Sequence, residues 1–385
     1  MIGRPTLETP VRVAQVDVRA PVDLHGPAGG RALLVFWRGD HPLGQAETLF
    51  GAAGQLHASD IAALVPPIEP PCPSSTGTLP RCSLVICTRD RPEELERCLN
   101  SLGTQSHRPD EVIVVDNAPT DERTWHVVQM AGATYVREDR PGLDVARNAG
   151  ARATQHAIIA FTDDDVVLHP RWLERLASAF DAPDIMAVTG LVLPAELETE
   201  AQQIFERHWG FGRGYQRLDF GREFFAATRA LGCPAWHIGA GASMAFRREA
   251  FEHVGYFDER LDAGAAGCSG DSEFWHRLLA AGWRCRYEPS SVAFHYHRRS
   301  LDALASQIRS YARGHVAALL VQYERTRERG NLRRIWSTLP HHYAYQFCKR
   351  LRHGRAPENY FLGEEVRGTL SGIVYYLATP RPAAR

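Results

Sequence analysis

The sequence predicts an α/β protein in which a mixed, mostly parallel sheet is flanked by helices. The first observation is a series of short apolar segments, rich in β-branched residues, that alternate with helical patterns. The second is the composition: of 385 residues, 44% are hydrophobic and 23% are charged, as in a globular protein with a large core. The predicted strands of the sheet are 83–88, 111–116, 133–136 and 157–162.

The helix expected after the first of these strands has a clear start signal. Asp90 and Glu93 have the spacing of a capping box, and Pro92 falls in the first turn. The face expected to lie on the sheet carries Leu95, Cys98, Leu99 and Leu102. In folds of this kind ligands bind beyond the carboxyl ends of the strands, so the residues there are the first candidates for a functional site.

Composition and pattern predict three further parts of the chain. Before the α/β region, two β-rich segments predict a small strand-rich unit, and a proline-rich stretch predicts a semi-rigid linker. After it, apolar residues at helical spacing predict a helical extension; its stripe is Leu304, Ile308, Tyr311, His315 and Leu319. The predicted organisation is a β-rich unit (1–65), a linker (66–80), the α/β domain (81–300) and the extension (301–385).

The charges of the chain nearly cancel, but they are unevenly distributed. The 44 basic and 45 acidic residues give a net charge of −1, so no overall field attracts nucleic acid, and none is expected as a partner. Residues 301–385 contain 14 basic and 6 acidic residues, a local net of +8. Lys349 is the only lysine, which excludes a Walker-type phosphate loop or a Schiff-base lysine in the first 348 residues.

Cysteine spacing and hydropathy predict a cytoplasmic protein. None of the eight cysteines forms a C-x-x-C pair or a disulfide-like pattern, which favours reduced thiols. The first residues, MIGRPTLETP, lack the apolar run of a signal peptide, and no stretch approaches the ~20 apolar residues that cross a bilayer. Contact with a membrane is therefore expected only as peripheral binding at its inner face.

Polar residues follow three of the predicted strands. Three consecutive carboxylates after the fourth strand repel one another and lose solvation, so they need a counter-ion. A hard divalent cation, Mg²⁺ or Mn²⁺, shared with substrate phosphates, supplies that charge; the alternative is that one aspartate caps the helix expected over 170–180. The residues at the three strand ends are Thr88 and Arg89, Asp116 and Asn117, and Asp163, Asp164 and Asp165.

Other polar residues allow both a functional and a structural interpretation. Arg147, in a helical segment after Gly142, suits a diphosphate or a salt bridge on the helix surface. Asp271 begins a helix, either as a carboxylate base that faces a cleft or as an N-cap. His295 and His297 lie on the same face of a strand, as metal ligands or as a hydrogen-bonded strand edge.

Seven segments, taken together and in order, resemble the inverting glycosyltransferases of family 2, which have the GT-A fold. They are VICTRDRP, VVDNAPTD, GLDVARNAG, FTDDDV, GAGASMAFRREAF, SGDSEFWHRLLAAGW and HYHRRS, within about residues 81–300. The resemblance implies transfer of a hexosyl or deoxyhexosyl group from a UDP-, dTDP- or GDP-sugar to an acceptor hydroxyl. It also implies a glycan or lipid-linked acceptor, in the synthesis of cell-surface polysaccharide or glycolipid.

The resemblance implies a role for each matching residue. Thr88 and Asp116 would line the pocket for the base and ribose of the donor. Asp163 and Asp165 would be the outer members of a D-x-D motif, with Asp163 near the ribose and Asp165 on the metal. Asp271 would be the general base. The remaining implied contacts are Arg89, Asn117, Arg147 and Asp164 with the donor, and Asp163 and one of His295 or His297 with the metal or diphosphate.

The chemistry of single displacement agrees with these residue types. It needs a departing diphosphate stabilised by a cation and an acceptor hydroxyl deprotonated as it attacks the opposite face of the sugar. The chain departs from the family at one point: where Glu-Asp is usual, it has Gly270-Asp271, so the base is kept and its acidic neighbour is missing. That departure motivates an alternative, a degenerate glycosyltransferase that serves as a carbohydrate-binding or scaffold protein.

Two other enzyme classes fit less of the sequence. A haloacid-dehalogenase-type phosphatase would use Asp163-x-Asp165 as its nucleophile loop and Gly270-Asp271 as a metal motif, but it needs a lysine between the two motifs and none is present. A nucleotidyltransferase would need a glycine-rich loop where CTRDRP stands.

Two further segments suggest how the acceptor binds. Residues 205–225 are rich in aromatic residues and glycine, which suits a mobile acceptor loop or a static hydrophobic flap. The basic, amphipathic C-terminal region, with Trp336 and several tyrosines, suits an anionic membrane; the alternative is that its apolar stripe packs on the catalytic domain.

Overall fold

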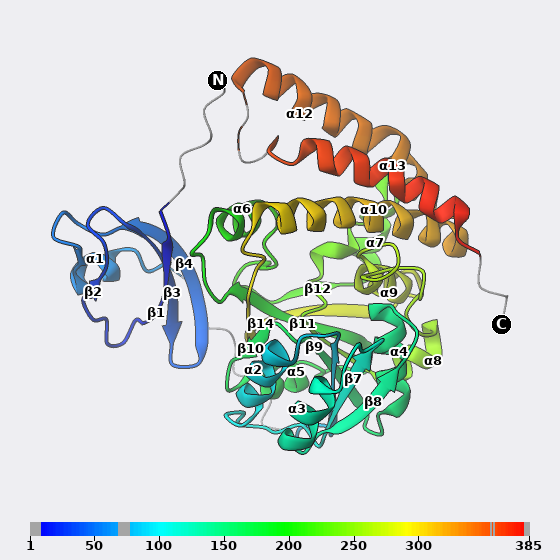
Figure 1. Cartoon of the computed structure of the whole chain (residues 1–385), viewed down its shortest axis with the longest axis horizontal. Helices are drawn as coiled ribbons and strands as arrows, with labels where there is room; N and C mark the ends of the chain where they lie inside the picture. The colour runs from blue at the N-terminus through cyan, green and yellow to red at the C-terminus, as the bar shows by residue number, and fades with distance from the viewer. Residues whose placement is uncertain (1–8, 68–77, 355, 357–358, 381–385) are drawn as a thin grey trace.

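A computed structural model describes residues 9–67, 78–354, 356 and 359–380. Figure 1 shows the N-terminal strands beside a larger α/β body, and long C-terminal helices that run along one side of that body. Most of the linker predicted over 66–80 lies outside the described residues. Among the described helices, none combines the length and hydropathy needed to cross a bilayer.

The central sheet is mixed and mostly parallel, as the sequence predicts. The neighbours β9, β6, β7 and β8 are parallel, whereas β13 and β10 run antiparallel to the strands beside them. A short strand, β12 (Leu218–Phe220), adds to β14. In spatial order the others are β10 (Val166–Leu168), β14 (Arg284–His295), β11 (Ile185–Pro194), β13 (Ser243–Arg247), β9 (Ile158–Asp163), β6 (Cys82–Thr88), β7 (Glu111–Asn117) and β8 (Thr134–Glu138).

Both faces of the sheet are buried, because alternate residues of each strand point to opposite faces. On β6, Val85 packs into one apolar cluster with residues of α4 and α9, while Leu84 and Ile86 pack into another with residues of α2 and α5. This explains why the strands are continuous apolar runs in the sequence. The helices around the sheet are α2 (Pro92–Leu102), α3 (Arg123–Ala131), α4 (Leu143–Ala153), α5 (Trp172–Ser178), α7 (Arg222–Thr228), α8 (Arg248–Val254) and α9 (Gly270–Ala280).

The capping box predicted for α2 is wrong, although the helix itself is confirmed. The N-cap residue is Arg91, and no side chain caps the helix. Asp90 has φ 53°, and its carboxylate accepts hydrogen bonds from the backbone N and Oγ1 of Thr120, both at 2.9 Å. The carboxylate therefore faces the loop after β7 instead of the helix.

The N-terminal strands form a separate sheet with a small apolar cluster that includes Leu34, Phe36 and Ile61. This sheet contacts the body through Trp37, which stacks on His169 with ring centroids 5.0 Å apart. Its elements are β1 (Val11–Asp17), β3 (Arg31–Arg38) and β4 (His41–Leu49), with β2 (Leu24–His25), β5 (Gln55–Leu56) and α1 (Ala58–Ala63) beside them.

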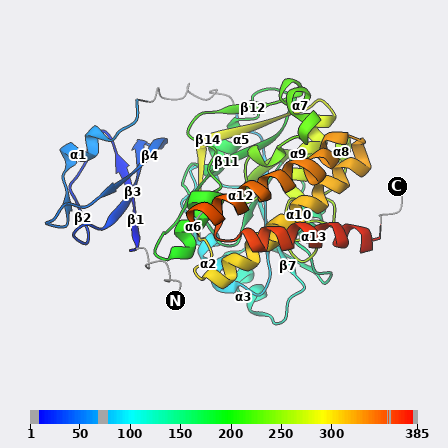
Figure 2. The same ribbon diagram turned by 90° about the horizontal axis from the view of Figure 1, so that it is seen from above.

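The C-terminal region is helical, as predicted. On α10 (Leu301–Thr326), Leu304 and Ile308 pack against α6 (Glu200–Trp209) of the body. The apolar stripe of α10 therefore packs on the α/β body, which is the alternative to a membrane-binding role for this stripe. After it come α11 (Arg329–Arg333), a π-helical turn (Arg334–Thr338), α12 (Leu339–His353) and α13 (Leu362–Ala378). Figure 2 shows α12 and α13 lying over α10 on the outside of the molecule.

Candidate functional site

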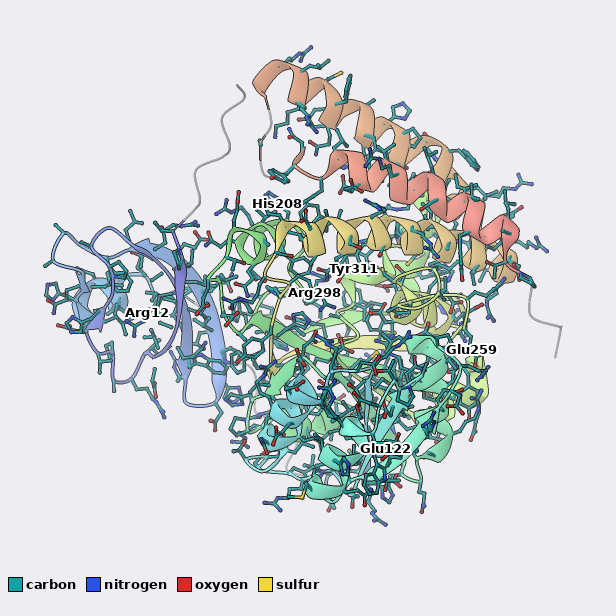
Figure 3. The ribbon with its side chains drawn as sticks, viewed as in Figure 1. Arg12, Glu122, His208, Glu259, Arg298 and Tyr311 are labelled. Carbon is teal, nitrogen blue, oxygen red and sulfur yellow. The ribbon has the colours of Figure 1, made fainter. Side chains whose placement is uncertain are left out.

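A cleft lies at the carboxyl ends of β6, β7 and β9, between the sheet and α10, and it contains two adjoining cavities. The first, of about 480 Å³, is lined by Thr88, Arg89 and the residues 163–165. The second, of about 770 Å³, is lined by Asp271 and by side chains of the C-terminal helices. Asp163, Asp262 and Tyr311 border both cavities. Figure 3 labels Tyr311 on the side of α10 that faces the sheet.

The acidic run after β9 is tied to β6 and to the loop that follows it. Thr88 Oγ1 donates to Asp164 Oδ2 at 2.7 Å, and Arg91 donates to Asp164 Oδ1 at 2.6 Å and to Asp165 Oδ2 at 2.8 Å. These aspartates do not cap the next helix: the strand β10 follows them, and the N-cap of α5 is Arg171. The helix-capping alternative is therefore wrong.

Asp165 and His295 form an ion pair at the edge of the first cavity. Asp165 Oδ1 lies 3.3 Å from His295 Nε2. Burial opposes the charge of both groups, but their mutual attraction raises the pKa of His295 and, with Arg91, holds the pKa of Asp165 well below its usual range. The aspartate is therefore ionised at neutral pH.

The two histidines predicted as metal ligands occupy different positions. His295 contacts Asp165, whereas His297 lies behind it: its Nδ1 is 2.9 Å from His295 Nδ1 and its Nε2 is 3.0 Å from Glu206 Oε2. His297 therefore orients His295 through their shared hydrogen bond. Glu206, on α6, was not predicted, because the sequence gives no sign that α6 approaches this strand.

The donor set at the strand end suits a hard divalent cation that is completed by a substrate. The carboxylate of Asp163 is 32% exposed and faces the cleft, and that of Asp165 lies two residues further on. Among the described residues no three His, Cys, Asp or Glu side chains converge into a full ligand set. Mg²⁺ is commonly held in this way, by one or two carboxylates with substrate phosphates and water.

The last two residues of β7 differ in role: Asp116 is a buried hydrogen-bond acceptor, and Asn117 fixes a loop. Asp116 is 0% exposed; Tyr135 donates to its Oδ2 at 2.9 Å, while its buried Oδ1 has no partner among the described residues. Burial raises the pKa of Asp116. Asn117 accepts from Gly142 N at 2.9 Å and donates to Arg140 O at 2.8 Å, so its side chain fixes the loop before α4. Arg89 is half exposed beside the first cavity.

Arg147 is the centre of a buried cluster of carboxylates. Its NH1 lies 2.7 Å from Asp262 Oδ2 and 3.1 Å from Asp144 Oδ1, and its NH2 is 3.8 Å from Asp163 Oδ1. Only 4% of its side chain is exposed, so the alternative of a surface salt bridge is wrong. The guanidinium instead joins Asp163, at the end of β9, to Asp144 and Asp262, near Asp271.

Asp271 faces the second cavity from the first turn of α9. The N-cap of this helix is Ser269, so the N-cap alternative is wrong for Asp271. Its Oδ1 accepts from Ser272 N at 2.6 Å, while its Oδ2 lies near Gly241, where an added Cβ would be 3.1 Å away. Burial and the charge of Asp262 raise its pKa, against the opposing effect of Arg147. A raised pKa makes a carboxylate a stronger base.

Asp144 occupies the space that a side chain at position 270 would need. A Cβ added to Gly270 would lie 2.5 Å from Asp144 Cγ and 2.6 Å from its Oδ1. The Oδ2 of Asp144 is buried without a partner among the described residues, and burial and Asp262 raise its pKa well above the usual range. The acidic neighbour that the sequence lacks before Asp271 is thus replaced in space by a carboxyl group from α4.

We expect Gly270→Glu, which would create a Glu-Asp pair, to abolish transfer. The new side chain must displace Asp144 and disturb Arg147, and overpacking of this kind costs about 1–3 kcal/mol of folding stability. The measurement is activity together with the melting temperature. Gly363→Ala, at a helical glycine with open space around it, is the matched control. Wild-type activity in Gly270→Glu would show that Asp144 does not occupy the space beside position 270. Partial recovery of activity in Asp144→Ala/Gly270→Glu would support that contact.

The second cavity combines part of the predicted aromatic segment with residues that the sequence did not identify. The predicted aromatic segment contributes Trp209, Phe211 and Arg213, and its first part is helical within α6. Arg334 and Tyr343 come from the C-terminal helices. The site residues missed from sequence are Arg91, Asp144, Glu206, Arg213, Asp262 and Arg334. Two of these residues lie in segments whose composition points to a functional loop. Asp262, at φ 63°, begins the glycine-rich stretch 262–270, and Arg91 belongs to the charged run TRDR. Nothing in the sequence near the other four indicates a site.

Comparison with known proteins gives a consistent result. The family described as "Glycosyl transferase family 2" matches residues 83–255. Glycosyltransferase AglE of Haloferax volcanii is 26% identical over 242 residues, 61% of this chain and 73% of that protein. The O-antigen biosynthesis protein RfbC of Myxococcus xanthus is 27% identical over 231 residues, 58% of this chain but only 18% of that protein. The pre-mycofactocin glycosyltransferase of Mycobacterium tuberculosis is 27% identical over 256 residues, 66% of this chain and 50% of that protein.

A solved structure gives the same result for the fold. The mannosyltransferase PcManGT from Pyrobaculum calidifontis, in complex with GDP-Man and Mn²⁺, superposes with a TM-score of 0.53 and covers 80% of this chain and 90% of its own. At 19% identity the likeness concerns the fold alone. The matched segment contains the strands β6, β7, β8 and β9 and the acidic run that follows them. Residues 83–255 of this chain are therefore similar to glycosyltransferase family 2, and its fold is that of the GT-A mannosyltransferase.

Proposed function

We propose that the protein is a metal-dependent, inverting glycosyltransferase that moves a hexosyl or deoxyhexosyl group from a UDP-, dTDP- or GDP-sugar to an acceptor hydroxyl. The observation that carries the proposal is the pair of adjoining cavities, one lined by Asp163 and Asp165 and the other by Asp271. A carboxylate base and a carboxylate metal site on opposite sides of one cleft are what a single displacement needs. The similarly folded Pyrobaculum mannosyltransferase was solved with GDP-Man and Mn²⁺.

In this proposal the first cavity holds the donor. Thr88 and Arg89 line this cavity, and Asp116, paired with Thr88 across the strands, is buried behind its wall. In the proposal its Oδ1, which has no partner among the described residues, accepts a hydrogen bond from the base or ribose. Asp163 and Asp165, with His295 behind them, would hold a divalent cation, which stabilises the negative charge of the departing diphosphate. Asp164 keeps Thr88 and Arg91 in position, because both of its oxygens accept their hydrogen bonds.

In the second cavity Asp271 acts as the general base. Its carboxylate takes the proton of the acceptor hydroxyl as that oxygen bonds to the anomeric carbon and the bond to the diphosphate breaks on the opposite face. The transition state has oxocarbenium character, as in glycoside hydrolysis. Arg147 holds Asp163 and Asp262 in place between the two reacting groups. Inversion follows because no covalent intermediate is formed with the enzyme.

The alternatives have less support. A phosphatase of the haloacid-dehalogenase type needs a lysine that the catalytic region lacks. A degenerate, non-catalytic protein was suggested by Gly270, but the carboxyl group of Asp144 fills that position. The test of the proposed function is a screen of nucleotide sugars with Mg²⁺ or Mn²⁺ and simple acceptors, in which ¹H NMR reads the anomeric configuration of the product. A retained configuration, or full activity in EDTA, would overturn it.

We also propose that the acceptor is a glycan or lipid-linked molecule of cell-surface polysaccharide or glycolipid synthesis, and that the enzyme reaches it as a cytoplasmic, peripheral protein. The support is the outer surface formed by the π-helical turn, α12 and α13 (Figure 1). Residues 329–356 contain seven basic residues and no acidic one. Exposed apolar side chains lie along both helices: Trp336, Tyr345, Phe347, Leu351, Leu370, Val374 and Leu377. Basic and apolar groups on one helix fit an anionic membrane surface.

We expect the full chain to float with vesicles that contain phosphatidylglycerol and to remain in solution with phosphatidylcholine alone. Trp336→Ser/Phe347→Ser/Leu351→Ser should lose flotation, because it removes apolar groups that would enter the headgroup region. Met130→Ser, at a 90% exposed residue of α3, is the control. Failure of the wild type to float with either vesicle would contradict peripheral binding.

A further inference from the structure

We propose that the acceptor carries a phosphate group, which Arg213 and Arg334 bind beside Trp236. This inference rests on the assignment of the second cavity to the acceptor. Both arginines line that cavity and come from distant parts of the chain: Arg213 follows α6, and Arg334 begins the π-helical turn before α12. Such turns are frequent at functional sites.

Neither guanidinium has a carboxylate partner within the described part of the chain. Arg334 donates from Nε to His315 Nε2 at 3.2 Å, and its guanidinium stacks on Trp236, 4.3 Å from the ring centroid. Arg213 donates to the main-chain oxygens of Trp236, Gly210 and Gly212. Carbonyl oxygens satisfy hydrogen bonds but do not neutralise a charge. Two cations are thus held in the wall of one cavity without a counter-ion.

Burial makes these charges costly. It lowers the pKa of both Arg213 and Arg334, although a guanidinium stays protonated in proteins. The imidazole of His237 is affected by both: burial lowers its pKa, and Arg213 and Arg334 lower it further. The two guanidiniums therefore act on the same region of the cavity. Arg147, which is more deeply buried than either of them, has carboxylate partners.

Among the described residues, the acidic groups near this region form no ion pair with either arginine, although the charges of Asp271 and Glu206 oppose the lowering of the pKa of Arg213. Asp163, Asp262 and Asp271 lie at the reacting end with Arg147. Glu365, on α13, lines the cavity, and burial alone raises its pKa; the described ion pairs include none between it and either arginine. An incoming anion is the missing counter-ion, and a phosphate monoester, with a charge of about −1.5 to −2 near pH 7, matches two guanidiniums.

The anion can belong to a lipid phosphate or to a phosphorylated sugar, and one experiment separates them. Binding of farnesyl phosphate, glucose 6-phosphate and the uncharged farnesol and glucose is measured from the tryptophan fluorescence of the full chain, with the nucleoside diphosphate present. We expect one of the phosphates to bind more tightly than its parent alcohol. Arg334→Gln and Arg213→Gln should each raise the Kd for that phosphate by roughly ten- to a hundredfold.

Arg333→Gln, at the exposed neighbour of Arg334, is the matched control and should bind as the wild type does. Unchanged binding of nucleoside diphosphate in the Arg334 and Arg213 variants would show that they are folded and that the donor side is intact. Equal binding of each phosphate and its parent alcohol overturns the proposal, as does a preference for phosphate that survives both substitutions. Because binding is read without turnover, this outcome is independent of whether transfer itself is observed.

Discussion

Asp271→Asn is expected to lower kcat by about 10²–10⁴-fold, the usual contribution of a positioned general base. The amide keeps the size of the side chain and its contact with Ser272, but it cannot accept the proton of the acceptor hydroxyl. The KM for the donor should change little, because Asp271 lines the second cavity and not the first. The measurement is initial rates with saturating donor and acceptor.

The pH profile of the wild type tests the same role. Only ionised Asp271 accepts a proton, so kcat/KM should rise with pH through the pKa of this group. Burial and Asp262 raise that pKa, so the rise should lie above the usual aspartate value of about 4. Asp139→Asn, at an exposed aspartate paired with Arg137, is the matched control and should keep full activity. Activity of Asp271→Asn within tenfold of the wild type would remove Asp271 from the mechanism.

Asp165→Ala is expected to reduce transfer by roughly a thousandfold, because Lewis-acid stabilisation of a departing phosphate is worth several kcal/mol. The substitution also leaves His295 without its carboxylate partner, while Arg91 keeps its contact with Asp164. Electron paramagnetic resonance of Mn²⁺ gives a readout besides activity: the variant should bind the ion more weakly in the presence of nucleoside diphosphate. Asp60→Asn, on α1, is the control. Equal Mn²⁺ binding by Asp165→Ala and the wild type would exclude Asp165 as a ligand.

The fold was largely predictable because its signals are local. The strands β6, β7 and β9 contain continuous apolar runs, and burial on both faces is the reason for that pattern; β8, at the edge of the sheet, is only partly buried. The polar residues at the ends of these strands, including Thr88 and Asp163, were identified because the carboxyl ends of parallel strands meet at one edge. The error at the start of α2 arose because a capping box depends on backbone angles: Asp90 has φ 53° and turns away.

The candidate site was predictable only in part, because partners far apart in sequence decide what each residue does. Arg147 was expected on a diphosphate, yet it is surrounded by Asp144, Asp163 and Asp262. Gly270 looked like a defect until the structure showed a carboxyl group from α4 in its place. The spacing of residues in the sequence does not predict that Asp144 fills the space beside Gly270, because the two residues are 126 positions apart.

The sequence by itself determined the fold class, the edge of the sheet that carries the acidic run, and, through a single lysine, which chemistries the catalytic region lacks. These follow from periodicity and residue type, which are properties of short segments. Only the tertiary structure decided how the charges are paired. It assigned a carboxylate cluster to Arg147 and, among the residues that the structure describes, none to Arg213 and Arg334, because the fold brings α6, α10 and the C-terminal helices around one cavity. Pairing depends on distances in space, and a sequence does not contain them.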